Sequence, residues 1–188
     1  MENYFTNDDE KLKWEQGKIT SLLKTKVFEV TSQHNTSFSK VEGDYIILNA
    51  KDWVITIPKK DDKFLMVKQW RHGSKSLSIE FPGGVIENDE KPEVAACREL
   101  EEETGYKVGK LTKLGSVNPN PALFSNKVHI FLAEDLISTG IQHLDNDEFV
   151  NFIEIPIKEI VQNMGNEQFP HALMGTALAM FLAKYKIN

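Results

Sequence analysis

Three glutamates between residues 99 and 103 limit what this chain can fold into more than any other feature. Glu99, Glu102 and Glu103 are spaced i, i+3 and i+4, so on a helix they share one face. Like charges on one face destabilise a bare helix, and an oxygen-loving divalent cation reverses that penalty. Ala96 and Leu100 define a neighbouring apolar stripe that can pack on a sheet. A solvated acidic surface helix is the ordinary alternative when such a run stands alone.

The residues around the glutamates contain start and stop signals for this helix. Asp89 or Glu90 can cap its first turn, and Pro92 stands where a proline is tolerated. Gly105 is a good C-terminal stop because glycine readily adopts the left-handed conformation. We therefore expect the helix to begin near residue 90 and to end at Gly105.

Apolar runs bounded by turn residues predict strands on both sides of this helix. Residues 24–49 are β-rich, and further strands are expected at residues 53–57, 64–67, 77–81, 113–117, 128–133 and 149–155. Helices are expected at residues 156–164 and 171–185, and the polar residues 1–16 are expected to form a short helix or a loose arm. Strands before and after an embedded helix indicate an α+β fold, an α/β/α sandwich.

The size and cysteine content of the chain suit a cytoplasmic protein. The 188 residues fit one domain, or a catalytic domain with a small extra piece. Cys97 is the only cysteine, so no intramolecular disulfide is possible. The apolar run at residues 177–183 is too short to span a bilayer, and the N-terminus lacks the pattern of a signal peptide. We expect no membrane partner.

The charge of the chain argues against nucleic acid as a partner. The net charge is −6, and the lysines and arginines are scattered rather than clustered in a basic footprint. An anionic small molecule is still compatible with this charge. An acidic pocket can hold a pyrophosphate if divalent cations lie between the two sets of negative charges.

The glutamates belong to a longer pattern that matches the Nudix box. The pattern is a glycine, five residues, a glutamate, seven residues, and then Arg-Glu-apolar-any-Glu-Glu-any-Gly-apolar. Its fixed positions are occupied by Gly84, Glu90, Arg98, Glu99, Glu102, Glu103 and Gly105. Chance agreement is on the order of 10⁻⁸ per start position, if each residue type occurs at roughly 1 in 15. Tyr106 is aromatic where an aliphatic residue is more usual. The chain thus resembles the Nudix hydrolase superfamily.

The resemblance extends to the branch of ADP-ribose and ADP-sugar pyrophosphatases. Residues 67–71 resemble the segment of that branch that ends in a substrate-binding arginine, and residues 79–84 resemble its lead-in to the box. A proline some fifteen residues past the box is associated with ADP-ribose specificity, and Pro121 lies 121 − 106 = 15 residues past Tyr106. The resemblance implies a Nudix fold at residues 51–188, with a mixed sheet, preceded by a β-rich segment at residues 1–50.

The resemblance also implies which residues bind metal. Glu99 and Glu103 would be direct ligands, with Glu102 binding the ion or lying beside it, and the Gly83 carbonyl would be a further ligand. The cofactor would be two or three Mg²⁺ or Mn²⁺ ions. Glu90 and Arg98 would mainly order the loop and the helix.

Three further residues are expected to contact the substrate or its surroundings. Arg71 would bind phosphate as a bidentate donor. Glu80 would support substrate or metal-bound water, and Phe38 aligns with a position that stacks on adenine in some relatives. The plain alternatives are a surface arginine for Arg71 and a salt-bridge partner for Glu80.

The general base is expected in the acidic segment that precedes the strand at residues 149–155. Glu148 is the first choice because it immediately precedes the apolar strand, as in relatives with a Glu-Phe-Val sequence. Asp147 and Asp145 are the fallbacks, and a solvated turn is the alternative for the whole segment. If none of the three acts, Glu102 becomes the leading candidate.

The activity implied by the resemblance is hydrolysis of the pyrophosphate of a nucleoside diphosphate sugar, with ADP-ribose giving AMP and ribose 5-phosphate. Residues 1–50 would be exchanged across a homodimer and help to form the base pocket. The open alternatives are GDP-mannose, another sugar nucleotide, a dinucleotide, an oxidised nucleoside triphosphate, or a non-catalytic ADP-ribose sensor. The intact box argues against a sensor, as does the lack of spare length for a DNA-binding domain.

Overall fold

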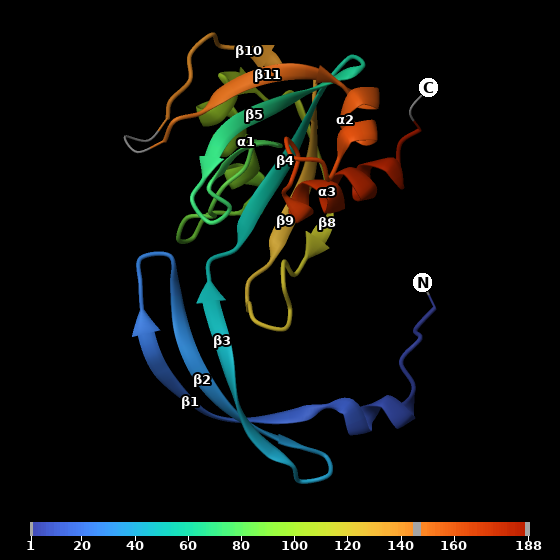
Figure 1. The fold of residues 1–188 in the computed structure, drawn as a ribbon. Coiled ribbons are helices and arrows are strands. Elements are labelled where there is room, and N and C mark those ends of the chain that lie inside the picture. Colours follow the sequence, from blue (N-terminus) through green and yellow to red (C-terminus); the bar gives the residue numbers. More distant parts are fainter. Residues whose placement is uncertain (1, 145–147, 187–188) are drawn as a thin grey trace. The chain divides into compact units, whose positions relative to one another are not determined.

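The computed structural model describes residues 2–144 and 148–186, and it divides into two compact units (Figure 1). The first unit contains residues 1–51 together with 120–126. The second contains residues 52–119 and 127–188, and therefore the whole glycine-to-Tyr106 motif. No helix in the described residues is long and apolar enough to cross a membrane.

The first unit is a three-stranded antiparallel sheet in the order β1-β2-β3. Its strands are β1 (Trp14–Lys24), β2 (Phe28–Ser37) and β3 (Glu42–Ala50), and a 3-10 helix, η1 (Asn7–Leu12), precedes them. A short helix was one of the two forms expected for residues 1–16, and strand β1 was not expected. All of its residues are exposed, so the strand has no buried face that would require apolar and polar residues to alternate in its sequence.

The second unit is built on a six-stranded mixed sheet. Along the sheet the order is β11-β5-β4-β9-β8, and β6 pairs with β5. The strands are β4 (Trp53–Lys60), β5 (Lys63–Arg71), β6 (Ser76–Glu80), β8 (Lys110–Val117), β9 (Val128–Glu134) and β11 (Asn151–Pro156). A separate two-stranded ladder joins β7 (Tyr106–Lys107) to β10 (Ile137–Ser138). Strands β4 and β9 are parallel and the other pairs are antiparallel, which makes the sheet mixed.

Helices cover both faces of this sheet (Figure 1). On one face Ala95 and Ala96 of α1 (Pro92–Thr104) pack with Val54 of β4 and with β9. On the other face α3 (Ala172–Leu182) and α2 (Ile157–Asn163) pack with Ile55 of β4 and with β5. Consecutive residues of β4 serve opposite faces because side chains alternate along a strand. The α/β/α sandwich expected from the sequence is therefore confirmed.

The structure corrects the ends of two helices. The N-cap of α1 is Lys91, without a side-chain cap, whereas Asp89 or Glu90 was expected. Glu90 instead turns its carboxylate to Arg98. The C-terminal end is as expected, because Gly105 adopts the left-handed conformation with φ 68°. The final helix stops at Leu182, about one turn earlier than expected.

Candidate functional site

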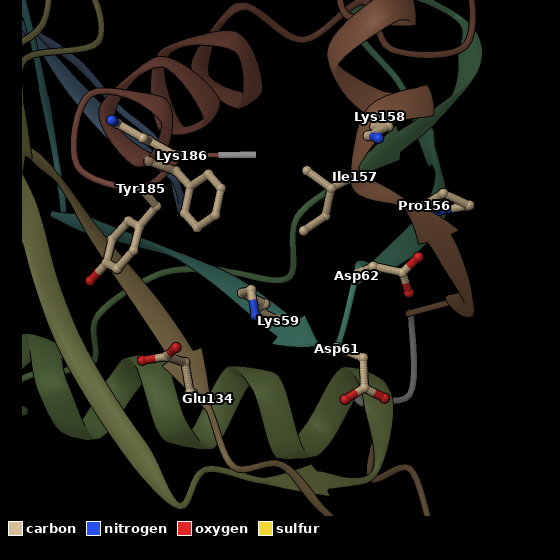
Figure 2. Close-up of a pocket in the computed structure, with 10 residues that line it drawn as sticks. Lys59, Asp61, Asp62, Glu134, Pro156, Ile157, Lys158, Tyr185 and Lys186 are labelled. Carbon is tan, nitrogen blue, oxygen red and sulfur yellow. The ribbon is translucent and has the colours of Figure 1, made fainter. Parts of the chain in front are cut away.

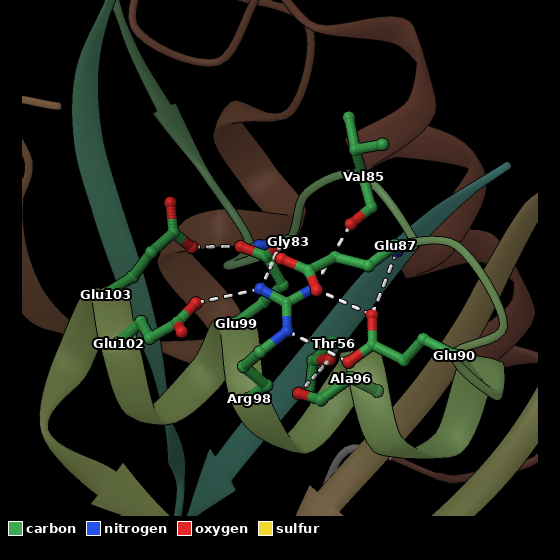
Figure 3. Close-up of polar contacts among 10 residues, drawn as sticks. All are labelled: Thr56, Gly83, Val85, Glu87, Glu90, Ala96, Arg98, Glu99, Glu102 and Glu103. Atoms are coloured by element: carbon green, nitrogen blue, oxygen red, sulfur yellow. Dashed lines mark hydrogen bonds and ion pairs between the residues drawn. The ribbon is translucent and has the colours of Figure 1, made fainter. Parts of the chain in front are cut away.

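The chain between β6 and α1 runs along β4 and places Gly83 beside the glutamate face, which is the side of α1 that carries Glu99, Glu102 and Glu103. The Pro82 carbonyl accepts from Thr56 N–H and the Gly84 carbonyl accepts from Val54 N–H, both at 2.9 Å. The intervening Gly83 N–H points elsewhere and donates to Glu103 Oε2 at 2.9 Å. The lead-in loop is thus fixed to the sheet on one side and to α1 on the other. Figure 3 shows the bond from Gly83 to Glu103.

The three glutamates lie on one side of α1 but differ in burial. Glu103 is 3% exposed and Glu99 is 9% exposed, while the Glu102 side chain is 35% exposed. Gly84 makes room for Glu99, because a Cβ at Gly84 would lie 2.5 Å from the Glu99 carboxylate. The shared face expected from the spacing therefore exists, and its two most buried members face the lead-in loop.

Arg98 holds three of the carboxylates together (Figure 3). Its Nε and Nη2 donate to the two oxygens of Glu90, each at 2.9 Å. Its Nη1 donates to Glu99 Oε1 at 3.0 Å and to Glu102 Oε2 at 2.9 Å. Nη2 also reaches the Val85 carbonyl at 3.2 Å, so the guanidinium ties the loop after Gly84 to the helix. This arrangement matches the ordering role expected of Glu90 and Arg98.

Burial makes two of the carboxyls hard to ionise. It raises the pKa of Glu103 to about 8, and the charges of Glu99 and Glu148 add to this, against the Gly83 N–H and Arg71. It raises the pKa of Glu99 to about 7, opposed by Arg98 and reinforced by Glu102 and Glu148. Nearby positive charge is what would favour the ionised forms of both groups.

The donor chemistry of this face suits a hard divalent cation, although its side chains are not gathered around a metal. Among the described residues, no group of three or more His, Cys, Asp or Glu side chains is placed to hold an ion. Glu99 and Glu102 are turned to Arg98, and Glu103 to Gly83. Carboxylate and carbonyl oxygens are nevertheless the ligands that Mg²⁺ and Mn²⁺ prefer, and buried carboxyls with raised pKa gain from a cation. The residues therefore fit such an ion chemically.

Arg71 and Glu80 form a two-bond ion pair beside the glutamates. Arg71 Nε and Nη2 donate to the two oxygens of Glu80 at 2.9 and 2.7 Å, and Glu80 is fully buried. Burial alone would raise the pKa of Glu80, but the bonds and charge of Arg71 outweigh it and hold the pKa below its usual value. The charge of Arg71 also acts on Glu103, which places the pair near the glutamate face. The pair uses Nε and Nη2 of Arg71, so Nη1 takes no part in it.

The remaining expected residues lie in different places. Glu148 is exposed and precedes β11, and its charge acts on both Glu99 and Glu103, so the fold brings it within electrostatic range of them. Asp145 and Asp147 lie outside the described residues. Phe38 lies in the first unit, in the turn between β2 and β3, and is 67% exposed.

The comparisons with known proteins agree with this geometry. Residues 50–173 match the model of the NUDIX domain family. The chain belongs to the NUDIX domain family. It is 41% identical over 103 residues to an ADP-ribose pyrophosphatase of Bacillus subtilis, which covers 54% of this chain and 56% of that protein. The match thus spans little more than half the length of that relative.

Two further comparisons cover more of the chain. It is 30% identical over 165 residues to GDP-mannose pyrophosphatase of Escherichia coli, covering 86% of this chain and 79% of that protein. The crystal structure of an ADP compounds hydrolase superposes with a TM-score of 0.82 at 24% identity, covering 91% and 93% of the two chains. The latter likeness confirms the Nudix fold.

One neighbour of the Nudix site was not found from the sequence. His171, the N-cap of α3, accepts Leu173 N–H at its Nδ1 and places Nε2 3.9 Å from Glu80 Oε2. The Gln168 carbonyl accepts Ile79 N–H at 2.8 Å, which brings this segment to the edge of β6. Nothing local in the sequence links residues 80 and 171, because the contact arises from tertiary packing alone.

Two other features of the Nudix unit lie outside the box. A pocket of about 460 Å³ is lined by residues of mixed charge, including Lys59, Asp62 and Tyr185, and by no box glutamate (Figure 2). His129 of β9 contacts Asp52 at 3.0 Å and Ser116 at 2.8 Å. Neither feature touches the glutamate face.

Proposed function

We propose that the protein hydrolyses the pyrophosphate bond of a nucleoside diphosphate sugar in a reaction that depends on divalent metal, with ADP-ribose giving AMP and ribose 5-phosphate. The observation that carries this proposal is the pair of buried carboxyls, Glu99 and Glu103, beside the Arg71 fork in an intact Nudix box. The ADP-ribose pyrophosphatase among the relatives supports the choice of substrate.

Each residue of the site has a part in this reaction. Glu99, Glu103, Glu102 and the Gly83 carbonyl would hold two or three Mg²⁺ or Mn²⁺ ions. When bound, the ions neutralise the pyrophosphate and lower the pKa of a water molecule. Arg71, held by Glu80, contacts a phosphoryl oxygen through Nη1 and stabilises negative charge there. Glu148 takes the proton of the attacking water.

A panel of substrates with product identification tests the proposal. ADP-ribose should give AMP and ribose 5-phosphate with the highest kcat/KM, and activity should vanish with EDTA and return with Mg²⁺ or Mn²⁺. The panel includes a dinucleotide and an oxidised nucleoside triphosphate. Full turnover of a metal-free preparation would overturn the mechanism. Tight binding of ADP-ribose without turnover would favour a sensor instead.

GDP-mannose is the second candidate substrate. The observation in its favour is coverage, because the similarity to the GDP-mannose pyrophosphatase extends over 86% of this chain and 79% of that protein. The two candidates share the same phosphorus chemistry and differ in the base and the sugar. A higher kcat/KM for GDP-mannose than for ADP-ribose would make it the substrate.

Gly84→Ala should weaken metal activation without unfolding the protein. The new Cβ would lie 2.5 Å from the Glu99 carboxylate, which is the flexible end of its side chain and can move aside. A displaced ligand should raise the Mg²⁺ concentration for half-maximal activity about 10- to 100-fold, the usual cost of disturbing a ligand's support. Gly73→Ala is the matched control, because a Cβ there meets no atom within 4 Å. Equal Mg²⁺ requirements in both variants would contradict the assignment of Glu99.

We also propose that the protein is a homodimer formed through the first unit. Apolar side chains of this sheet are exposed, among them Ile19 (60%), Leu22 (55%) and Leu23 (57%). Light scattering should therefore give about twice 21.4 kDa. Deletion of residues 1–48 should impair substrate binding more than metal binding. A monomer with full activity on ADP-ribose would refute this arrangement.

A further inference from the structure

The C-terminal end of α1 is capped by the segment that follows β10. Carbonyls in the last turn of a helix lack partners within the helix. Here the Gly105 carbonyl accepts from both N–H and Oγ1 of Thr139, each at 2.8 Å. The Glu102 carbonyl accepts from His143 N–H at 2.9 Å. The backbone that carries the box glutamates is thus joined to residues 139–143.

Gln142 extends this junction to a second part of the chain. Its Nε2 donates to the carbonyl of Glu103 and also to the carbonyl of Val150, the latter at 3.4 Å. Val150 is buried and lies immediately before β11. A primary amide is suited to this position because its one nitrogen carries two N–H donors. One side chain therefore links the last turn of α1 to the start of β11.

Glu148 lies two residues before Val150, and its charge acts on Glu99 and Glu103. We propose that Gln142 is a positioning residue that sets where the Glu148 carboxylate lies relative to the box glutamates. The inference rests on the proposed function, in which Glu148 takes a proton from water. Gln142 bonds Val150 to the helix that carries Glu99 and Glu103. It thereby fixes the position of the base relative to the proposed metal ligands.

The contact chemistry gives a way to separate hydrogen bonding from simple packing as the role of Gln142. Both acceptors are carbonyl oxygens, so a side chain of the same shape without N–H donors places an acceptor against two acceptors. Glutamate has this shape. If packing were the role of Gln142, Gln142→Glu would be milder than Gln142→Ala. If hydrogen bonding is the role, Gln142→Glu is at least as harmful.

A double-mutant cycle with Glu148→Gln tests the proposal, using ADP-ribose and saturating Mg²⁺. Gln142→Ala should lower kcat about 10- to 100-fold, the scale on which a displacement of about 1 Å acts, with little change in KM. Gln142→Glu should lower kcat at least as much. In the Glu148→Gln background, where the base is already lost, Gln142→Ala should change kcat by less than about threefold.

Thr139→Val is the matched control for damage to the helix end. It removes the hydroxyl bonds to the Gly105 and Ile141 carbonyls, while the Thr139 N–H bond to the Gly105 oxygen and both Gln142 bonds remain. Among the described residues, Thr139 makes no hydrogen bond to Val150 or to β11. This variant should lower the thermal midpoint as much as Gln142→Ala does, yet keep kcat within about twofold of wild type.

Three results would overturn the inference. The first is an equal loss of kcat from Gln142→Ala in both backgrounds, because Gln142 would then act independently of Glu148. The second is a raised Mg²⁺ requirement in Gln142→Ala with kcat restored at high Mg²⁺, which would place its action on Glu103. The third is a wild-type kcat in Gln142→Ala. A wild-type kcat in Glu148→Gln alone is a different failure, because it removes the base from the proposed function itself.

Discussion

Glu103→Gln is expected to lower kcat by about 10³-fold or more, the scale on which loss of a group that stabilises the transition state acts, while the fold stays intact. Glu103 is the most buried of the box glutamates, and its carboxylate accepts the Gly83 N–H. A glutamine oxygen can keep that hydrogen bond but cannot supply the negative charge that a cation requires. Steady-state kinetics with ADP-ribose and Mg²⁺ measure the loss.

Glu101→Gln is the control for this substitution. Glu101 lies on the same helix, at a position of the box that any residue can occupy, and its carboxylate is 3.6 Å from the Lys107 ammonium. It should keep near-wild-type kcat. Comparable losses in Glu101→Gln and Glu103→Gln would mean that the helix tolerates no change of charge, and a near-wild-type Glu103→Gln would remove Glu103 from the site.

Glu103→Gln, which should lower kcat, should raise the stability of the fold when metal is absent. Burial raises the pKa of Glu103 from 4.5 to about 8, so the folded state retains this proton where the unfolded state loses it. The stabilising contribution of the protonated form is complete below about pH 4.5 and is lost as pH rises through about 8. In EDTA, thermal unfolding at pH 8 should therefore show Glu103→Gln to be more stable than the wild type, and the difference should shrink toward pH 5.

Glu148→Gln should lower kcat by roughly 10² to 10⁴, the usual range for loss of a general base. Carboxylates bound to cations make poor bases because the metal lowers their proton affinity, so a separate carboxylate is needed. Glu148 is exposed and lies within electrostatic range of Glu99 and Glu103. KM should change little, because Arg71 and the box glutamates remain.

Substitutions in the same acidic segment decide between the candidates for the base. If Glu148→Gln keeps near-wild-type kcat while Asp147→Asn or Asp145→Asn abolishes it, the base is one of those aspartates. If all three variants keep kcat, the base lies outside the segment and Glu102 becomes the candidate. Product analysis in each variant confirms that the same bond is cleaved.

The sequence predicts those parts of the fold whose side chains are buried in a regular pattern. Strands β4 and β9 are apolar along most of their length, and Gly105 ends α1 at the expected residue. Strand β1 was missed because all of its residues are exposed. The N-cap of α1 was placed wrongly because Glu90 binds Arg98 rather than the helix start.

In the candidate site, the residues predicted together from the sequence are those whose contacts are local. The box glutamates and Arg98 are close in sequence, so their spacing alone places them on one helix. His171 and Gln142 reach Glu80 and the Glu103 carbonyl across 91 and 39 residues of chain, and no local pattern signals such contacts. From the sequence, Arg71 and Glu80 were expected to have separate roles, whereas in the structure they form one ion pair.

The edge position of strand β1 affects how this protein can associate with other copies of itself. It is the outer strand of its sheet, and an outer strand offers backbone N–H and C=O groups to any passing strand. Its register against β2 is irregular twice, between Gln16 and Ile19 and between Ser21 and Leu23. Such bulges twist an edge and interrupt the even spacing that strand addition requires. The bulges therefore disfavour continuous growth of the sheet by addition of a strand from one chain after another. A second copy that covers β1 would instead contact its exposed apolar side chains.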